Sequence, residues 1–257
     1  MWPLSFKLTN ELHNIRQNRV SIEDSKMQGG KDVVERDHPE IAAGGYAQDD
    51  SMVAFYQRVM AVLPEGAAVL DLGAGRGHWA YLTGEDFPPL RSWLYRLGKK
   101  YSRRIGADVI PEVKSNSELD EAVIIEAGKP LPFPDQSFDL ILADWVLEHV
   151  EHPQSFAEEV WRVLKIGGWF CARTPNRWSY FAIGSRIIPD KIGRLVLRWL
   201  QPWRDDRDTF RTFYRLNTLG ILARYFPASR WINASYIHNE NLTYHGNRWW
   251  LYHTISL

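Results

Sequence analysis

The chain has 257 residues, with 31 Lys and Arg against 31 Asp and Glu and with 45% hydrophobic residues. This length and composition suit one globular domain with elaborations and exclude a disordered chain. A single cysteine, Cys171, excludes an internal disulfide framework and a multi-cysteine zinc site, and no apolar run reaches the ~18 residues of a membrane span. Because the first residues also lack a secretory signal pattern, we expect a cytoplasmic protein.

The charge is unevenly distributed along the chain. Residues 172–257 contain thirteen Lys and Arg against five Asp and Glu, so this part carries about +8 and the rest about −8. A basic face favours an anionic partner, although a solvated basic surface explains the same composition. No RNA-binding module is recognisable, which argues against a nucleic-acid partner. Monomer and homodimer are both compatible with the sequence.

The first helix is predicted after an N-terminal arm. Residues 1–50 are polar and weakly patterned, and we interpret them as an arm and lid in front of one domain over residues 51–257. After the N-cap pair Asp49-Asp50, apolar side chains recur with helical spacing at Met52, Tyr56, Val59 and Leu63.

Strand and helix patterns then alternate. We predict strands over residues 67–72, 105–110, 122–126, 138–143 and 169–172. A helix through Phe156 and Leu164 is expected to stop at Gly167-Gly168. This alternation predicts an α/β class with a doubly wound, mostly parallel sheet. Two late strands, 231–238 and 248–255, are separated by too short a loop for a crossover helix, so we expect an antiparallel C-terminal pair.

A glycine-rich loop follows the first strand, in the sequence Asp71-Leu-Gly-Ala-Gly-Arg-Gly77. Glycines let a backbone turn sharply and approach a ligand closely. An NAD-binding fingerprint would need its third glycine at position 78, which is His78, and an acid about 20 residues further on. The strand-end acid Asp108 comes later than that, so an NAD-linked oxidoreductase remains only an alternative.

The same loop resembles the first motif of the class I S-adenosylmethionine (SAM) dependent methyltransferases. The resemblance continues through Ile105 to Glu112, Leu131 to Val150, Glu158 to Gly168 and Thr174-Pro-Asn176. It implies a Rossmann-like fold with a helical cap, and the nearest branch resembles the quinone-biosynthesis methyltransferases. Two features depart from the family pattern: an insertion over residues 87–104, and Glu126-Ala127 in place of the usual Asp-Ala.

The resemblance implies which residues hold the cofactor SAM. The loop residues Gly73, Ala74, Gly75 and Gly77 would approach its amino-acid end, and Asp71 would orient the loop or receive the ammonium. Asp108, next to Val109, would accept hydrogen bonds from the ribose hydroxyls, unless it serves as a helix cap. Glu126 and Ala127 would contact the adenine, and Asp144 and Trp145 would lie at the end of the fourth strand. No metal is implied.

Catalysis and acceptor recognition have weaker candidates. His149 and Asp144 are candidate catalytic residues, although a structural role for His149 remains open. Tyr46 would fold over the cofactor, and Tyr214, Arg215 and Asn217 lie in residues 177–228, where the family places its acceptor-recognition insert. The sequence predicts a small or lipid-like acceptor without identifying it.

Two basic amphipathic segments, residues 88–100 and 187–203, lie outside the motifs. Such helices can contact an anionic membrane peripherally, or they can pack their apolar faces into the domain. The sequence therefore predicts a SAM-dependent methyltransferase, with a non-catalytic, membrane-associated SAM-binding regulator as a further alternative.

Overall fold

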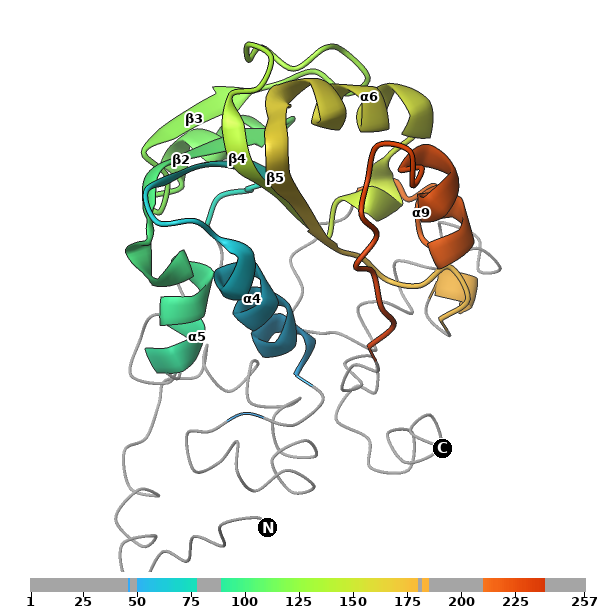
Figure 1. The fold of residues 1–257 in the computed structure, drawn as a ribbon, viewed down its shortest axis with the longest axis horizontal. Coiled ribbons are helices and arrows are strands. Elements are labelled where there is room, and N and C mark those ends of the chain that lie inside the picture. The colour runs from blue at the N-terminus through green and yellow to red at the C-terminus, as the bar shows by residue number, and fades with distance from the viewer. Residues whose placement is uncertain (1–45, 47–49, 78–88, 180–181, 185–209, 239–257) are drawn as a thin grey trace, which may run out of the picture.

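The computed structural model describes residues 46, 50–77, 89–179, 182–184 and 210–238, and the fold is given for these residues (Figure 1). In chain order the elements are α4 (Ser51–Val62), β1 (Ala67–Leu72), α5 (Pro89–Tyr95), η4 (Leu97–Lys99), β2 (Tyr101–Asp108), η5 (Pro111–Ser115), β3 (Glu121–Ile124), β4 (Phe138–Asp144), η6 (Leu147–His149), α6 (Pro153–Val163), β5 (Leu164–Arg173) and α9 (Leu219–Tyr225). The described strands form one sheet in the order β3-β2-β1-β4-β5, and every neighbouring pair is parallel.

Helices cover both faces of the sheet, as Figure 1 shows for α4 and α5 on one face and α6 on the other. The first face packs Val69 and Leu142 against α4 and α5, and the second packs Leu70 and Ile141 against Val160 of α6. Successive strand residues therefore enter opposite cores. Because β1 and β4 are buried on both faces, each contains an uninterrupted apolar run, residues 67–70 in β1 and residues 140–143 in β4, as is typical of parallel sheets.

The predicted doubly wound α/β class is confirmed, but two element boundaries were wrong. The helix ends at Val163 rather than at Gly167-Gly168. Leu164 is extended and buried, and it pairs with Phe138 at the start of β5. The glycines instead lie at an irregularity in β5, where a Cβ on Gly168 would lie 2.9 Å from the backbone oxygen of Asp139.

The second boundary is the start of β2. This strand begins at Tyr101, so part of the segment interpreted as an insertion over residues 87–104 belongs to the sheet. The rest includes α5 and η4, which bury Leu94 and Leu97 under the sheet. None of the helices in the described part of the chain is long and apolar enough to cross a bilayer.

The antiparallel C-terminal pair is not confirmed. Residues 231–238 have no regular secondary structure, and the predicted partner strand over residues 248–255 lies outside the described residues. The N-terminal arm before Tyr46 and the basic segment 187–203 also lie outside them.

Candidate functional site

The predicted site residues lie along one edge of the sheet. Because the strands are parallel, the loops that follow β1, β2, β3 and β4 all leave at the carboxyl edge. The chain order changes direction between β1 and β4, which is where open α/β sheets bind ligands. This edge carries the glycine loop, Asp108-Val109, Glu126-Ala127 and Asp144-Trp145.

The glycine loop is pressed against the turn that follows β4. Gly73 has a φ of 69° and donates its N–H to Ala107 O at 2.8 Å. A Cβ on Gly73 would lie 2.4 Å from Cγ2 of Val146, and one on Gly77 would lie 2.4 Å from Oδ1 of Asn116. Any larger residue would therefore force the loop away from its neighbours.

Gly75 differs from these two glycines. It also has a positive φ, 55°, but a Cβ there would meet no heavy atom of the described structure within 4 Å. Its N–H donates to Oδ2 of Asp108 at 2.8 Å, and Oδ1 of Asp108 accepts from Ile110 N at 3.2 Å. Gly75 thus presents open space directly beside the strand-end carboxylate, and the neighbouring Val109 is 47% exposed.

Asn116 is hydrogen-bonded to the glycine loop. Its side chain is buried, and Nδ2 donates to Ala74 O at 3.1 Å and to Gly75 O at 3.4 Å. Sequence analysis did not find this residue. It belongs to no recognisable motif, and it is more than 40 residues away from the loop along the chain.

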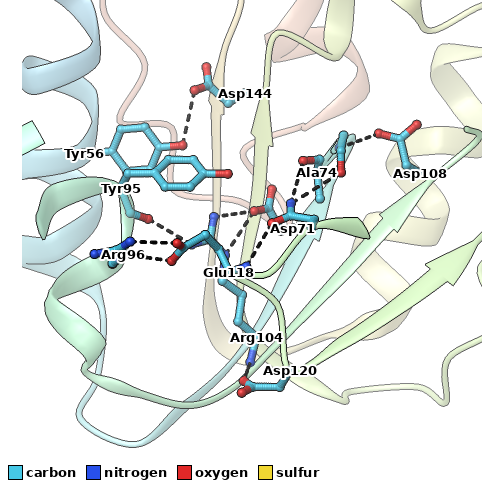
Figure 2. Close-up of polar contacts among 12 residues, drawn as sticks. Tyr56, Asp71, Ala74, Tyr95, Arg96, Arg104, Asp108, Glu118, Asp120 and Asp144 are labelled. Carbon is cyan, nitrogen blue, oxygen red and sulfur yellow. Dashed lines mark hydrogen bonds and ion pairs between the residues drawn. The ribbon is translucent and has the colours of Figure 1, made fainter. Parts of the chain in front are cut away.

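Asp71 does not face solvent; it forms a buried ion pair. Arg104, on β2, is fully buried and donates to Oδ2 of Asp71 from Nη2 at 2.5 Å and from Nε at 3.1 Å (Figure 2). Arg104 also donates to Tyr95 O and lies over the Tyr95 ring. Burial raises the pKa of Asp71, and the guanidinium opposes that shift. The Asp71 carboxylate is therefore committed to Arg104 beneath the loop.

Asp144 forms a second pair at the end of β4. Arg173 donates from Nε to Oδ1 at 2.7 Å and from Nη2 to Oδ2 at 2.9 Å, and Tyr56 OH lies 3.3 Å from Oδ2. The remaining Nη1 of Arg173 donates to Ser51 Oγ. Both carboxylate oxygens are thus engaged by a bidentate cation, and the start of α4 is tied to the sheet edge.

Trp145 and the turn after it lie at the same edge. Trp145 has a φ of 59°, an uncommon conformation for a bulky residue, and its N–H donates to Arg173 O at 2.8 Å. Strained backbone of this kind is concentrated at functional sites. His149 ends η6, and its Nδ1 donates to Arg211 O at 2.8 Å, because a carbonyl oxygen can only accept.

Glu148, which sequence analysis passed over, is buried beside these residues. Its Oε2 accepts from Thr174 Oγ1 at 2.9 Å. Burial, reinforced by Asp144, raises the pKa of Glu148 to about 7, although Thr174 and Arg173 act in the opposite direction. In the sequence, Glu148 is recognisable as an acidic residue among the largely apolar residues that end at Val150.

The predicted acceptor residues occupy different environments. Tyr214 and Asn217 are buried, and Nδ2 of Asn217 donates to Thr174 Oγ1 and Pro175 O. Arg215 is exposed and donates to Glu151 O, and Tyr46 is 41% exposed just before α4. The described residues contain no group of three or more His, Cys, Asp or Glu side chains that could hold a metal ion.

Comparison with known proteins shows which proteins this chain is similar to. Residues 70–172 match the family model described as a methyltransferase domain. An uncharacterised protein of Methanocaldococcus jannaschii is 32% identical over 124 residues, which cover 47% of this chain and 51% of that protein. The ubiquinone/menaquinone biosynthesis C-methyltransferase UbiE of Zymomonas mobilis is 30% identical over 155 residues, or 56% of each chain.

Among solved structures, an S-adenosylmethionine dependent methyltransferase from Mesorhizobium loti is 24% identical, with 48% of this chain and 54% of that chain covered and a TM-score of 0.36. The chain spans about half the length of the relatives it matches. The family match covers β1 through β5 almost completely and includes the glycine loop and Asp108. Residues 70–172 are therefore similar to the methyltransferase domain family over almost the whole described sheet and its glycine loop.

Proposed function

We propose that this protein is a SAM-dependent methyltransferase. The observation that carries the proposal is the glycine loop at Gly75, whose N–H donates to the strand-end carboxylate of Asp108 and whose Cβ position has no described heavy atom within 4 Å. A ligand with an amino-acid end and a ribose needs a loop that allows close backbone approach and an acceptor for hydroxyl groups. The family match favours this interpretation over an NAD-linked oxidoreductase.

The residues at the carboxyl edge fit the parts of SAM. Gly73, Ala74, Gly75 and Gly77 would line its amino-acid end, and Asp108 would accept from its ribose hydroxyls. The exposed side chain of Val109 and the exposed pair Glu126-Ala127 would flank the adenine. Asp71 would act indirectly, because its carboxylate is held by Arg104 below the loop.

Catalysis by this chain would rest on alignment. SAM supplies an already activated methyl group when it is bound, so holding the acceptor in line provides most of what the reaction needs. Asp144 is engaged by Arg173 and would fix the strand end that presents Trp145. His149 is the candidate proton acceptor, because an imidazole can exchange a proton near neutral pH and its Nδ1–Arg211 O bond fixes the ring at this edge.

We further propose a small or amphiphilic acceptor. Support comes from the relatives named as ubiquinone/menaquinone biosynthesis C-methyltransferases and from two exposed aromatic side chains, Trp178 after β5 and Phe210 against the ring of His149. Fractionated extracts incubated with labelled SAM would reveal the acceptor. In a thermal-shift assay, SAM or its demethylated product should raise the melting temperature, and NAD should not; stabilisation by NAD alone would refute the proposal.

Gly75→Ala tests the loop directly. We expect at least a tenfold loss of SAM affinity in calorimetric titration, because the new methyl group occupies the open space beside Asp108. Gly66→Ala is the matched control: Gly66 also has a positive φ, 71°, and open space around its Cβ among the described residues, but it precedes β1 at the opposite edge. Equal affinity losses in both variants would mean that backbone strain alone explains the effect.

Asp108→Ala tests the ribose contact. Loss of the carboxylate should weaken SAM binding by about 1.5–3 kcal/mol, which is typical of hydrogen bonds to a charged group. Calorimetric titration measures the change. Asp108 also accepts from Gly75 N, so the variant needs a control for the structure of the loop. The N–H of Gly73 is bonded to Ala107 O and not to Asp108. Unchanged hydrogen exchange at Gly73 would show that the loop keeps its structure. Wild-type affinity would show that Asp108 does not contact the cofactor.

A further inference from the structure

Residues 211–217 return to the carboxyl edge of the sheet and are bonded to the two loops that follow β4 and β5. From the β4 side, Glu148 O accepts from Phe213 N at 2.7 Å and from Tyr214 N at 3.1 Å. Arg211 O accepts from Nδ1 of His149. From the β5 side, Arg177 N donates to Asn217 O at 2.9 Å. This segment, which we call the edge segment, therefore borders the half of the sheet edge away from the glycine loop.

A relay of three side chains joins the same three parts of the chain, with the half-buried Thr174 between the buried Glu148 and Asn217. Thr174 Oγ1 donates to Oε2 of Glu148 at 2.9 Å and accepts from Nδ2 of Asn217 at 2.6 Å. The hydroxyl hydrogen is used toward the carboxylate, so the amide must be the donor on the other side. Glu148 is 3% exposed and Asn217 is 2% exposed, so the two outer members of the relay are shielded from water.

Glu148 is the residue on which these contacts converge. Its backbone oxygen holds two amides of the edge segment, and its carboxylate orients the hydroxyl that holds Asn217. Burying a carboxyl group raises the free energy of folding unless hydrogen bonds replace its lost contacts with water. The glycine loop and Asp108 take no part in these contacts, because they follow β1 and β2 on the other side of the switch point.

We infer that Glu148 is a positioning residue that fixes the edge segment as a wall of the methyl-acceptor side, acting through Thr174 and Asn217. That the edge segment faces a methyl acceptor rests on the proposed function. The anchoring of the edge segment by Glu148 does not depend on that function. Glu148 would thus control acceptor recognition without contributing to SAM affinity.

Hydrogen–deuterium exchange of the full chain tests the anchoring. Glu148→Ala and Thr174→Val should each speed exchange in residues 211–217 by about tenfold, because the relay that opposes local opening is lost. Glu148→Gln should retain slow exchange, since its amide oxygen still accepts from Thr174. Glu151→Gln removes an exposed carboxylate three residues along the same turn and serves as the matched control. Exchange over residues 67–77 should stay unchanged in all four variants.

SAM titration of the same variants separates the inference from the proposed function. We expect dissociation constants within twofold of wild type, together with lost methyl transfer in Glu148→Ala and its recovery in Glu148→Gln. Wild-type exchange in both Glu148→Ala and Thr174→Val would overturn the anchoring role. Slow exchange with lost turnover in Glu148→Gln would overturn it too, because Glu148 would then act at the reacting atoms. If wild type neither binds SAM nor transfers methyl groups, the proposed function fails while the exchange result still decides the anchoring.

Discussion

Replacing Arg104 with Met should lower the free energy of unfolding by about 3–5 kcal/mol, the usual loss when one member of a buried ion pair is removed. Arg104 is fully buried, and Asp71 would be left as a carboxylate without its guanidinium partner. The variant can relieve this cost by protonating Asp71. The loss measured by urea denaturation should therefore shrink toward acidic pH.

Arg103→Met provides the control for this experiment. Arg103 is the adjacent residue of β2, but its side chain is 57% exposed and its partner Glu121 is 46% exposed. Exposed pairs of this kind contribute about 0–1 kcal/mol. The double variant Asp71→Asn/Arg104→Met should recover part of the loss, because no unpaired charge remains. Similar losses in the two single variants would contradict a special role for the buried pair.

Replacing Glu148 with Gln should stabilise the protein at pH 8 by up to about 3 kcal/mol and should have little effect near pH 4.5. Burial raises the pKa of Glu148 to about 7, above the ordinary value of 4.5 for a glutamate. Between these two values the native state holds a proton that the unfolded state has released. Wild-type stability therefore falls as pH rises through this window, whereas the Gln variant resembles the protonated form at every pH.

Urea denaturation of wild type and Glu148→Gln at several pH values measures the widening difference. The charged groups that act on Glu148 are Asp144 on β4, which raises its pKa, and Arg173 on β5, which lowers it. Glu151→Gln, which removes an exposed carboxylate from the same turn, controls for the change in net charge. A constant difference between pH 5 and pH 8 would show that Glu148 titrates alike in the folded and unfolded chain.

The sequence by itself determined the features that depend on local chemistry. Apolar runs located β1 and β4 because both strands are buried on two faces, and the glycines located the loop because its positive φ angles exclude most other residues. Asp108 was assigned from the family resemblance, and the structure has it at the end of β2, at the edge where the ends of parallel strands meet. The helix end before β5 was misplaced, since tertiary pairing of Leu164 with Phe138 outweighed the local stop signal of two glycines.

Only the tertiary structure decided which polar groups are partners. Asp71 and Arg104 are 33 residues apart, Glu148 and Thr174 are 26 apart, and Asn217 lies 43 residues beyond Thr174. The register of β1 against β2 places Asp71 opposite Gly106, two residues beyond Arg104 and on the same face. No local pattern encodes such a pairing, because it depends on strand register and on burial that excludes water. For the same reason the sequence could not show that the motif acid Asp71 is paired with Arg104 beneath the glycine loop.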